Sequence, residues 1–153
     1  MPHSRNDSPA AAWSALLRVH AQVVPALDAD LRRSVGIPLA WYDVLLELDG
    51  LDRLRMSDLG ERVVLSRTRV SRLVTELESH GLVRRESNPD DGRSAFVAIT
   101  EAGRAKFREA APRYLAGIER RFAARLDPGE LAAVASALRK VLGPEELPSP
   151  TFQ

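Results

Sequence analysis

The spacing of the apolar residues changes abruptly at Gly81, from a helical period before this residue to a strand period after it. Four apolar residues upstream are spaced at i, i+3, i+4 and i+7, which predicts one buried stripe on an α-helix. They are Val70, Leu73, Val74 and Leu77. Downstream, residues 82–86 and 95–99 predict two short strands, joined by the turn-forming run Ser87–Gly92. The fold must therefore allow a helix to lead directly into a β-hairpin.

A shorter helix precedes this one. Ser57 begins it, and Leu59 and Val63 are its apolar contacts. The longer helix begins at Leu65–Ser66, after a tight connection. The order of helix, tight turn, helix and hairpin is typical of a winged helix-turn-helix domain, which we assign to residues 36–100.

Two helices come before this motif. The first covers residues 10–34, where apolar residues recur at steps of three and four. Pro25 is expected to kink it, and Gly36 is expected to end it. The second helix starts near Pro38, which suits a first turn, and ends at Gly50.

Two more helices follow the hairpin. Thr100 can cap the first, which keeps helical spacing to about Arg125 although Pro112 interrupts it. The second is opened by the N-terminal signal Asp127–Glu130 and ends at Leu142. The predicted fold class is therefore mainly α with a small β-hairpin. Residues 1–9 are expected to form a flexible N-terminal tail, and residues 144–153 a C-terminal tail.

Composition excludes several classes of protein. The chain has 153 residues, no cysteine and a formal net charge of +1 at pH 7. Without cysteine there is no disulfide framework, thiolate zinc site or thiol-based redox sensing. No apolar run approaches the roughly 20 residues of a membrane span, and the N-terminus lacks a secretory signal, so we expect a cytoplasmic protein with no membrane partner. A net charge near zero does not test for a nucleic-acid partner, because the placement of the charges matters more than their sum.

The outward face of the longer helix suits double-stranded DNA. A rotation of 100° per residue places short polar side chains and arginines opposite the apolar stripe. Residues 62–74 contain four arginines and no aspartate or glutamate. Arginine can contact guanine edges and phosphates, and serine and threonine hydroxyls can contact either. The expected DNA-contacting residues of this helix are Ser66, Arg67, Thr68, Arg69, Ser71, Arg72 and Thr75.

The hairpin favours DNA binding over the alternative of a merely solvated amphipathic helix. Its stiff tip projects Arg93 and Ser94, and such a ribbon fits a minor groove, where narrow A·T-rich DNA concentrates negative potential. Asp91 would repel phosphate, so we expect it to pair with Arg85 or Arg93 and to support the wing. The alternative for Arg93 is a weak surface salt bridge with Asp90 or Asp91.

Other classes of function have less support in the sequence. A hydrolase or transferase needs a nucleophile with a base, or a metal cluster, but the three histidines are scattered and no HExxH, GxSxG or P-loop motif is present. They are His3, His20 and His80. We therefore expect no catalytic residue, metal or cofactor. A winged domain that binds proteins instead of DNA would have a neutral or acidic outer helix face, which Thr68, Arg69 and Arg72 argue against.

The chain resembles the MarR family of winged-helix transcription regulators from about Trp13 to Leu142. The resemblance is strongest over residues 65–103, which are similar to the family's recognition helix, GLVxR strand, DxR wing and closing LTxxG, with Ile99 in place of leucine. Residues 36–45, GIPLAWYDVL, are similar to the pattern GLTxxQxxVL. Pro38, Trp41 and Gly60 depart from the family's usual threonine, glutamine and alanine.

This resemblance implies a homodimer that binds a pseudo-palindromic operator as a repressor. Residues 10–35 and 101–143 would be its dimerisation helices, and their apolar stripes are too long for a small winged domain to cover. The alternative is that these stripes pack on each other within one chain. Family members often bind a small aromatic or lipophilic effector in an apolar pocket with a few polar groups. The alternative is that a histidine or tryptophan on a helical apolar stripe is a core or interface residue. The candidates for an effector pocket are Trp13, His20, Trp41, Tyr42 and Asp43.

Overall fold

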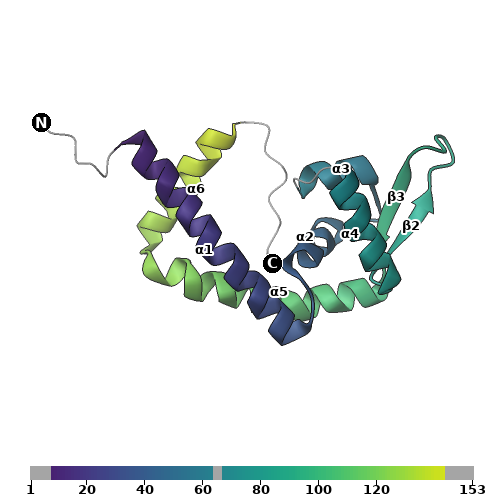
Figure 1. Cartoon of the computed structure of the whole chain (residues 1–153), viewed down its shortest axis with the longest axis horizontal. Helices are drawn as coiled ribbons and strands as arrows, with labels where there is room; N and C mark the ends of the chain where they lie inside the picture. The colour runs from purple at the N-terminus through teal and green to yellow at the C-terminus, as the bar shows by residue number, and fades with distance from the viewer. Residues whose placement is uncertain (1–7, 64–66, 144–153) are drawn as a thin grey trace, which may run out of the picture.

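The computed structural model describes residues 8–63 and 67–143, and within these it contains six α-helices and a small antiparallel sheet (Figure 1). The helices are α1 (Pro9–Val35), α2 (Leu39–Leu48), α3 (Met56–Arg62), α4 (Arg67–Ser79), α5 (Glu101–Arg121) and α6 (Pro128–Leu142). A short 3-10 helix, η1 (Ala123–Arg125), separates the last two. The predicted fold class is therefore confirmed. The predicted tails lie almost entirely outside the described residues.

Local sequence signals account for the ends of α1. The hydroxyl of Ser8 accepts a hydrogen bond from the N–H of Ala11 at 3.1 Å, so the helix begins at Pro9, one residue before the predicted start. Gly36 has a φ of +74°, and its N–H donates to the carbonyls of Leu31 and Arg32. The helix continues as one element through Pro25. Gly36 thus ends α1 as predicted.

The start of α2 depends on a residue of α1. Pro38 occupies the N-cap position and has no side-chain oxygen that could accept a hydrogen bond. Asp28 supplies the acceptor instead, because its Oδ1 accepts from the N–H of Leu39 at 2.8 Å. Burial alone would raise the pKa of Asp28, but the hydrogen bonds from Leu39 and Arg32 hold it below its usual value. This carboxylate of α1 therefore caps the start of α2.

The core lies where α1, α2, α4 and α5 meet the sheet. Three of the four residues in the predicted stripe of α4 are buried, and Leu73 is partly buried against the same core. Tyr42 is fully buried, with its ring centroid 5.5 Å from that of Phe107 and 4.6 Å from that of Tyr114. Its hydroxyl has no hydrogen-bond partner among the described residues. The helical period therefore identified the buried face of α4 correctly.

The sheet has three strands, one more than the sequence predicts. Strands β2 (Val83–Ser87) and β3 (Ala95–Ile99) form the predicted hairpin, within one residue of the expected bounds. Strand β1 (Leu54–Arg55) pairs antiparallel with the other edge of β3. A strand of two residues shows no alternation of apolar and polar residues, so the sequence did not indicate it. β1 holds the start of α3 beside the wing.

Two glycines of α5 allow close packing. The hydroxyl of Thr100 accepts from the N–H of Gly103 at 3.0 Å and caps the helix, as predicted. A Cβ atom on Gly103 would overlap the carbonyl oxygen of Leu82, which accounts for the glycine in the closing LTxxG motif. A Cβ atom on Gly117 would lie 2.7 Å from Cδ2 of Leu27. Helices α1 and α5 therefore pack closely at Gly117, where an added Cβ atom would have to displace the side chain of Leu27.

Helix α6 is well capped but poorly packed. Asp127 and Glu130 form the predicted capping box, in which each side chain accepts from the backbone N–H of the other residue at 2.9 Å. None of the residues of α6 is buried. In Figure 1, α6, the first half of α1 and the end of α5 form one end of the molecule, and the sheet lies at the other end. The winged region therefore contains most of the core.

Candidate nucleic-acid interface

Helix α4 presents a polar face to solvent. The residues of this face are exposed along the helix from its first turn. Those described are Thr68, Arg69, Ser71, Arg72 and Thr75. Ser66 and the side chain of Arg67, which the sequence also assigns to this face, lie outside the described residues. Arg72 has no hydrogen bond or ion pair to another described residue, so its guanidinium is available to a partner.

Both acids of α4 lie in its second half and contact other parts of the chain. Glu76 accepts a hydrogen bond from Nε1 of Trp41 at 3.2 Å, which links α4 to α2. Glu78 accepts from the backbone N–H of Arg85 at 2.9 Å, which links α4 to β2. The first turn of α4 contains no acid. The exposed first half of the helix therefore carries only positive charge and hydroxyl groups.

Arg85 connects the wing to α4 rather than to the wing tip. Its guanidinium donates to the carbonyl of Ser71 and to the hydroxyl of Thr75, both at 3.0 Å, and lies 3.5 Å from the carboxylate of Glu78. The expected pairing of Arg85 with Asp91 is therefore wrong, because three groups of α4 hold this side chain. The hydroxyl of Thr75 also donates to the carbonyl of Ser71, so it is engaged within the protein.

The wing tip is held by short side chains. Asn88 is only 7% exposed, and its Nδ2 donates to the hydroxyl of Ser94 at 2.8 Å. Its Oδ1 accepts from the N–H of Asp90 at 3.0 Å. Asp91 does support the wing, but it accepts from the backbone N–H of Arg93 at 3.0 Å instead of pairing with a guanidinium. The Arg93 side chain is exposed and unpaired among the described residues, so it can reach outward from a rigid turn.

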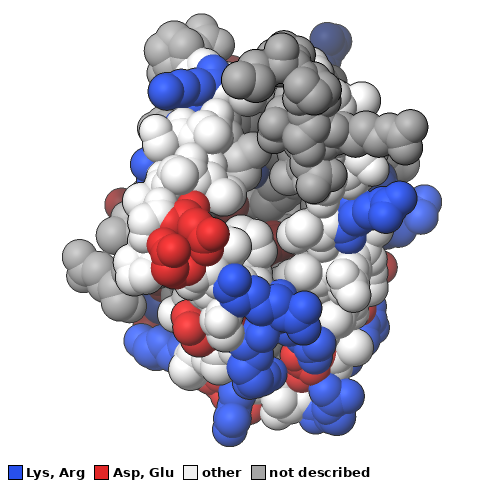
Figure 2. All heavy atoms as spheres, turned by 90° about the vertical axis from the view of Figure 1, so that its left-hand side faces the viewer, with Lys and Arg blue, Asp and Glu red and all other residues white. Residues whose placement is uncertain are grey.

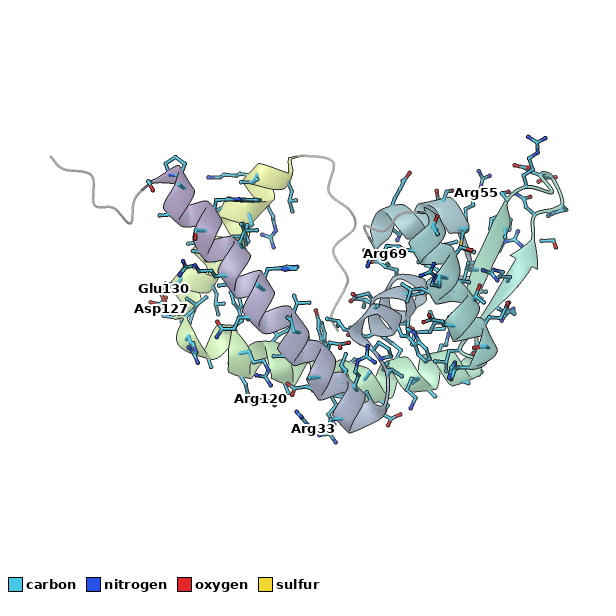
Figure 3. The ribbon with its side chains drawn as sticks, in the orientation of Figure 1. Arg33, Arg55, Arg69, Arg120, Asp127 and Glu130 are labelled. Carbon is cyan, nitrogen blue, oxygen red and sulfur yellow. The ribbon has the colours of Figure 1, made fainter. Side chains whose placement is uncertain are left out.

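A hollow lies between the wing, α4 and the start of α3. Arg93 and Ser94 of the wing and Ser71 of α4 line it together, so the structure brings the two predicted DNA-binding elements to one place. Arg55 and Ser57 also line it, and sequence reasoning missed them as candidates. Figure 3 shows Arg55 beside the wing, at the same end of the molecule as Arg69. Recognition of β1 would have placed Arg55 next to the hairpin, but two residues give no pattern.

Nearby basic side chains are engaged within the protein. Arg53 lies over the ring of Phe96, with its Cζ 4.0 Å from the ring centroid, and its guanidinium contacts Glu86 at 3.2 Å. Arg84 contacts the same carboxylate at 3.1 Å. The hydrogen bonds from Arg53 and Arg84 lower the pKa of Glu86. Arg53 and Arg84 therefore stabilise the sheet surface, whereas Arg55 is exposed to a ligand.

The five residues predicted for an effector pocket do not meet within one chain. Trp13 and His20 are exposed on the first half of α1, whereas the buried residues of this helix lie in its second half. Tyr42 is a core residue. Trp41 is partly exposed, with its ring centroid 4.7 Å from that of His80. Asp43 is partly buried, and burial and the nearby charge of Glu47 raise its pKa to about 6.

The described residues contain neither a cluster that could hold a metal ion nor a helix that could span a membrane. They include no group of three or more histidine, aspartate and glutamate side chains placed to hold a metal ion. None of their helices combines the length and the apolar character needed to cross a membrane.

Comparison with known proteins identifies relatives with the same architecture. Residues 35–94 match the model of the MarR family. AbsC, a MarR family transcriptional regulator from Streptomyces coelicolor, is 32% identical and superimposes with a TM-score of 0.80, covering 92% of this chain and 95% of AbsC. Sco3205 from the same organism, a MarR family regulator solved in complex with DNA, is 30% identical with a TM-score of 0.80. The match covers 88% of this chain and 90% of Sco3205. CouR from Rhodococcus jostii, solved bound to p-coumaroyl-CoA, is 26% identical with a TM-score of 0.75. The match covers 89% of this chain and 94% of CouR.

Proposed function

This chain belongs to the MarR family of winged helix-turn-helix transcriptional regulators, and on that premise we propose that it represses transcription as a homodimer bound to a pseudo-palindromic operator. It acts in the cytoplasm, where it meets double-stranded DNA. The observation that carries this proposal is the exposed, acid-free first half of α4 beside the exposed side chains of Arg55 and Arg93. One surface thus combines a helix for reading bases with two cations in the hollow beside it.

The arrangement assigns a role to each part of this surface. The first half of α4 enters the major groove, where Arg72 reads a guanine edge or contacts a phosphate. The wing lies along the neighbouring minor groove, and Arg93 extends into it from the turn held by Asn88 and Asp91. Arg55, from the hollow between these two elements, contacts the phosphate backbone.

Exposed apolar residues support the homodimer. Trp13 is 62% exposed and Val141 is 83% exposed, although both belong to long amphipathic helices. Other large apolar side chains that are exposed on α1, α5 and α6 are Leu16, Leu17, Val19, Leu115, Leu138 and Leu142. Figure 2 shows this end of the molecule, where uncharged side chains cover much of the described surface. Several large apolar side chains exposed on the same helices indicate a protein interface, and a second copy supplies the same helices by twofold symmetry.

Selection of bound DNA from a random pool by the full-length protein tests the proposal. We expect an enriched inverted repeat whose half-site centres lie about one DNA turn, roughly 34 Å, apart. Two chains per duplex should be found by analytical ultracentrifugation of the complex. Enrichment of no palindrome would contradict the proposal and favour a winged domain that binds other proteins.

An effector that releases the DNA is a second part of the proposal, supported by Trp41 and Asp43. Trp41 contacts Glu76 of α4, and Asp43 is a partly buried acceptor on the same helix, α2. At Asp43, a small aromatic molecule with a hydroxyl or amine donor would bind better than an aromatic acid, because a second carboxylate would repel Asp43. Such a molecule must bind the DNA-competent and DNA-incompetent arrangements with different affinity.

The test of the effector is a panel of phenols, aromatic amines and aromatic acids, assayed for release of operator from the dimer. We expect release by neutral or cationic compounds and a loss of this release in Asp43→Asn. Release by the acids alone, or an unchanged response in Asp43→Asn, would contradict the assignment.

A further inference from the structure

A hollow between the end of α1 and the middle of α5 forms a second candidate site. Four arginines line it, one from α1 and three from α5. They are Arg33, Arg108, Arg113 and Arg120. Pro112 and Ala116 lie between the arginines of α5 on the same helix face, because residues four apart are neighbours on a helix. Short side chains on the floor and long cationic side chains around it leave room for a small ligand.

Asp30, the acid that α1 contributes to the hollow, is already neutralised. Its carboxylate accepts hydrogen bonds from Arg121 at 2.8 to 3.0 Å and lies 3.5 Å from Arg120. Arg33 binds it as well. The hydrogen bonds from Arg121, together with the charges of Arg33 and Arg120, lower the pKa of Asp30 below its usual value. The carboxylate is therefore ionised and shared among three guanidinium groups.

Glu109, the acid that α5 contributes, is also paired. Its carboxylate lies 3.0 Å from Nζ of Lys106, which in turn donates to the carbonyl of Val35. Arg108 and Arg113 have no acidic partner in the described part of the chain. The hollow therefore has an excess of positive charge that its described neighbours do not cancel.

The position of the hollow separates it from the candidate DNA-binding surface. In Figure 3, Arg33 and Arg120 lie at the lower edge of the molecule, whereas Arg55 and Arg69 lie in its upper right part. A duplex held by α4 and the wing would not reach the lower edge. The arginines of this hollow are thus unexplained by operator binding.

We propose that this hollow binds a small anion carrying two or more phosphate groups. A guanidinium group presents a planar fork that matches phosphate geometry, and charge-assisted hydrogen bonds of this kind are strong. Arg108 and Arg113 supply two such forks from adjacent turns of α5, and Arg33, which pairs with Asp30, adds positive charge from α1. Arg108 and Arg113 can each bind a different phosphate, which favours a diphosphate over a single phosphate group. This inference does not depend on the operator or on the proposed effector.

Isothermal titration calorimetry of the full-length protein with inorganic pyrophosphate tests the proposal. We expect saturable binding that weakens as salt is added, and an affinity at least about tenfold lower in Arg108→Gln and in Arg113→Gln. Arg104→Gln is the matched control, because it removes the same charge from α5 outside the hollow, where Arg104 pairs with Glu101. Equal affinity in all three variants, or no saturable binding, would overturn the proposal.

Three further measurements identify the ligand class and show whether the variants remain folded. Tighter binding of ADP than of pyrophosphate would show that a nucleoside also contacts the site, and equal binding would show that the diphosphate alone is recognised. Orthophosphate should bind more weakly than both, and equal binding of orthophosphate would contradict a site for two phosphates. Unchanged melting temperatures of the two variants would show that any loss of binding is not a loss of folding.

Discussion

Helices α4 and α6 are similar in length, with 13 and 15 residues, and both are amphipathic, but only α4 buries its apolar stripe. The core of its own chain covers that stripe, so the opposite face of α4 is free to bind a ligand. Helix α6 buries none of its residues, so its apolar side is the one that needs a partner. Two helices with the same kind of amphipathic pattern therefore expose different faces: α4 exposes its polar face and α6 its apolar one. The elements packed around each helix determine which face is exposed.

The largest effect is expected from a charge on the uncovered side of α6. Leu138→Glu would place a carboxylate in the proposed dimer interface, at a cost of about 3 kcal/mol or more and a loss of dimer affinity above roughly a hundredfold. Sedimentation should show a monomer that binds operator poorly. Ser136→Glu on the same helix is the control. If the Leu138→Glu variant remains a dimer, the apolar side of α6 does not form the interface, and the contrast drawn between α4 and α6 is wrong.

The pH dependence of stability tests the burial of Asp43 on α2, in the part of the molecule that its own core covers. Because the pKa of Asp43 is raised to about 6 in the folded chain, the folded state holds this proton more tightly than the unfolded state does. Stability should therefore fall as the pH rises from about 4 to about 6. Asp43→Asn should remove this loss and stabilise the protein by up to about 3 kcal/mol at pH 7.5, but not at pH 4. Urea unfolding at both pH values measures it, and equal effects at both would contradict the burial argument.

Arginine removal tests whether the free face of α4 and the wing read DNA. Arg72→Ala and Arg93→Ala should each weaken operator binding by about tenfold to a hundredfold. If the arginine contacts a phosphate, its removal should reduce the slope of log K against log salt by about 0.9, whereas an effect confined to one base position would indicate base reading. Mobility-shift titrations over a range of salt measure both. If both variants bind like the parent protein, the surface has been assigned wrongly.

Arg85 tests whether the wing and α4 act as one body. Arg85→Ala removes the hydrogen bonds to Ser71 and Thr75 and should weaken operator binding by roughly tenfold. Because Arg85 positions these elements rather than contacting phosphate, the salt slope should stay as it is in the parent protein. Arg85→Lys should restore little, since lysine lacks the planar fork. A reduced slope in Arg85→Ala would show direct DNA contact instead.

The smallest effect is expected in the core beneath α4. Tyr42→Phe removes a buried hydroxyl that has no partner among the described residues, and it keeps the ring between Phe107 and Tyr114. The free energy of unfolding should stay the same or rise by up to about 1 kcal/mol. Thermal denaturation measures this. A loss of more than about 1 kcal/mol would mean that the hydroxyl does have a partner, which would make Tyr42 more than a core residue.

The sequence by itself determined the elements whose causes are local. The 3.6-residue period specified the buried face of α4, and Gly36, Thr100 and the pair Asp127 and Glu130 specified helix ends, because caps depend on residues within a turn of each other. Five of the seven residues assigned to the outer face of α4 lie among the exposed described residues for the same reason.

Only the tertiary structure decided what depends on residues far apart in the chain. Arg85 contacts α4, 7 to 14 residues away, Asp28 caps a helix that begins 11 residues later, and Arg55 reaches the wing through a two-residue strand. Tyr42 is in the core rather than in a pocket because α5 places two aromatic rings beside it. The partners of a long side chain follow from how the elements pack, and no period or spacing in the sequence encodes that packing directly.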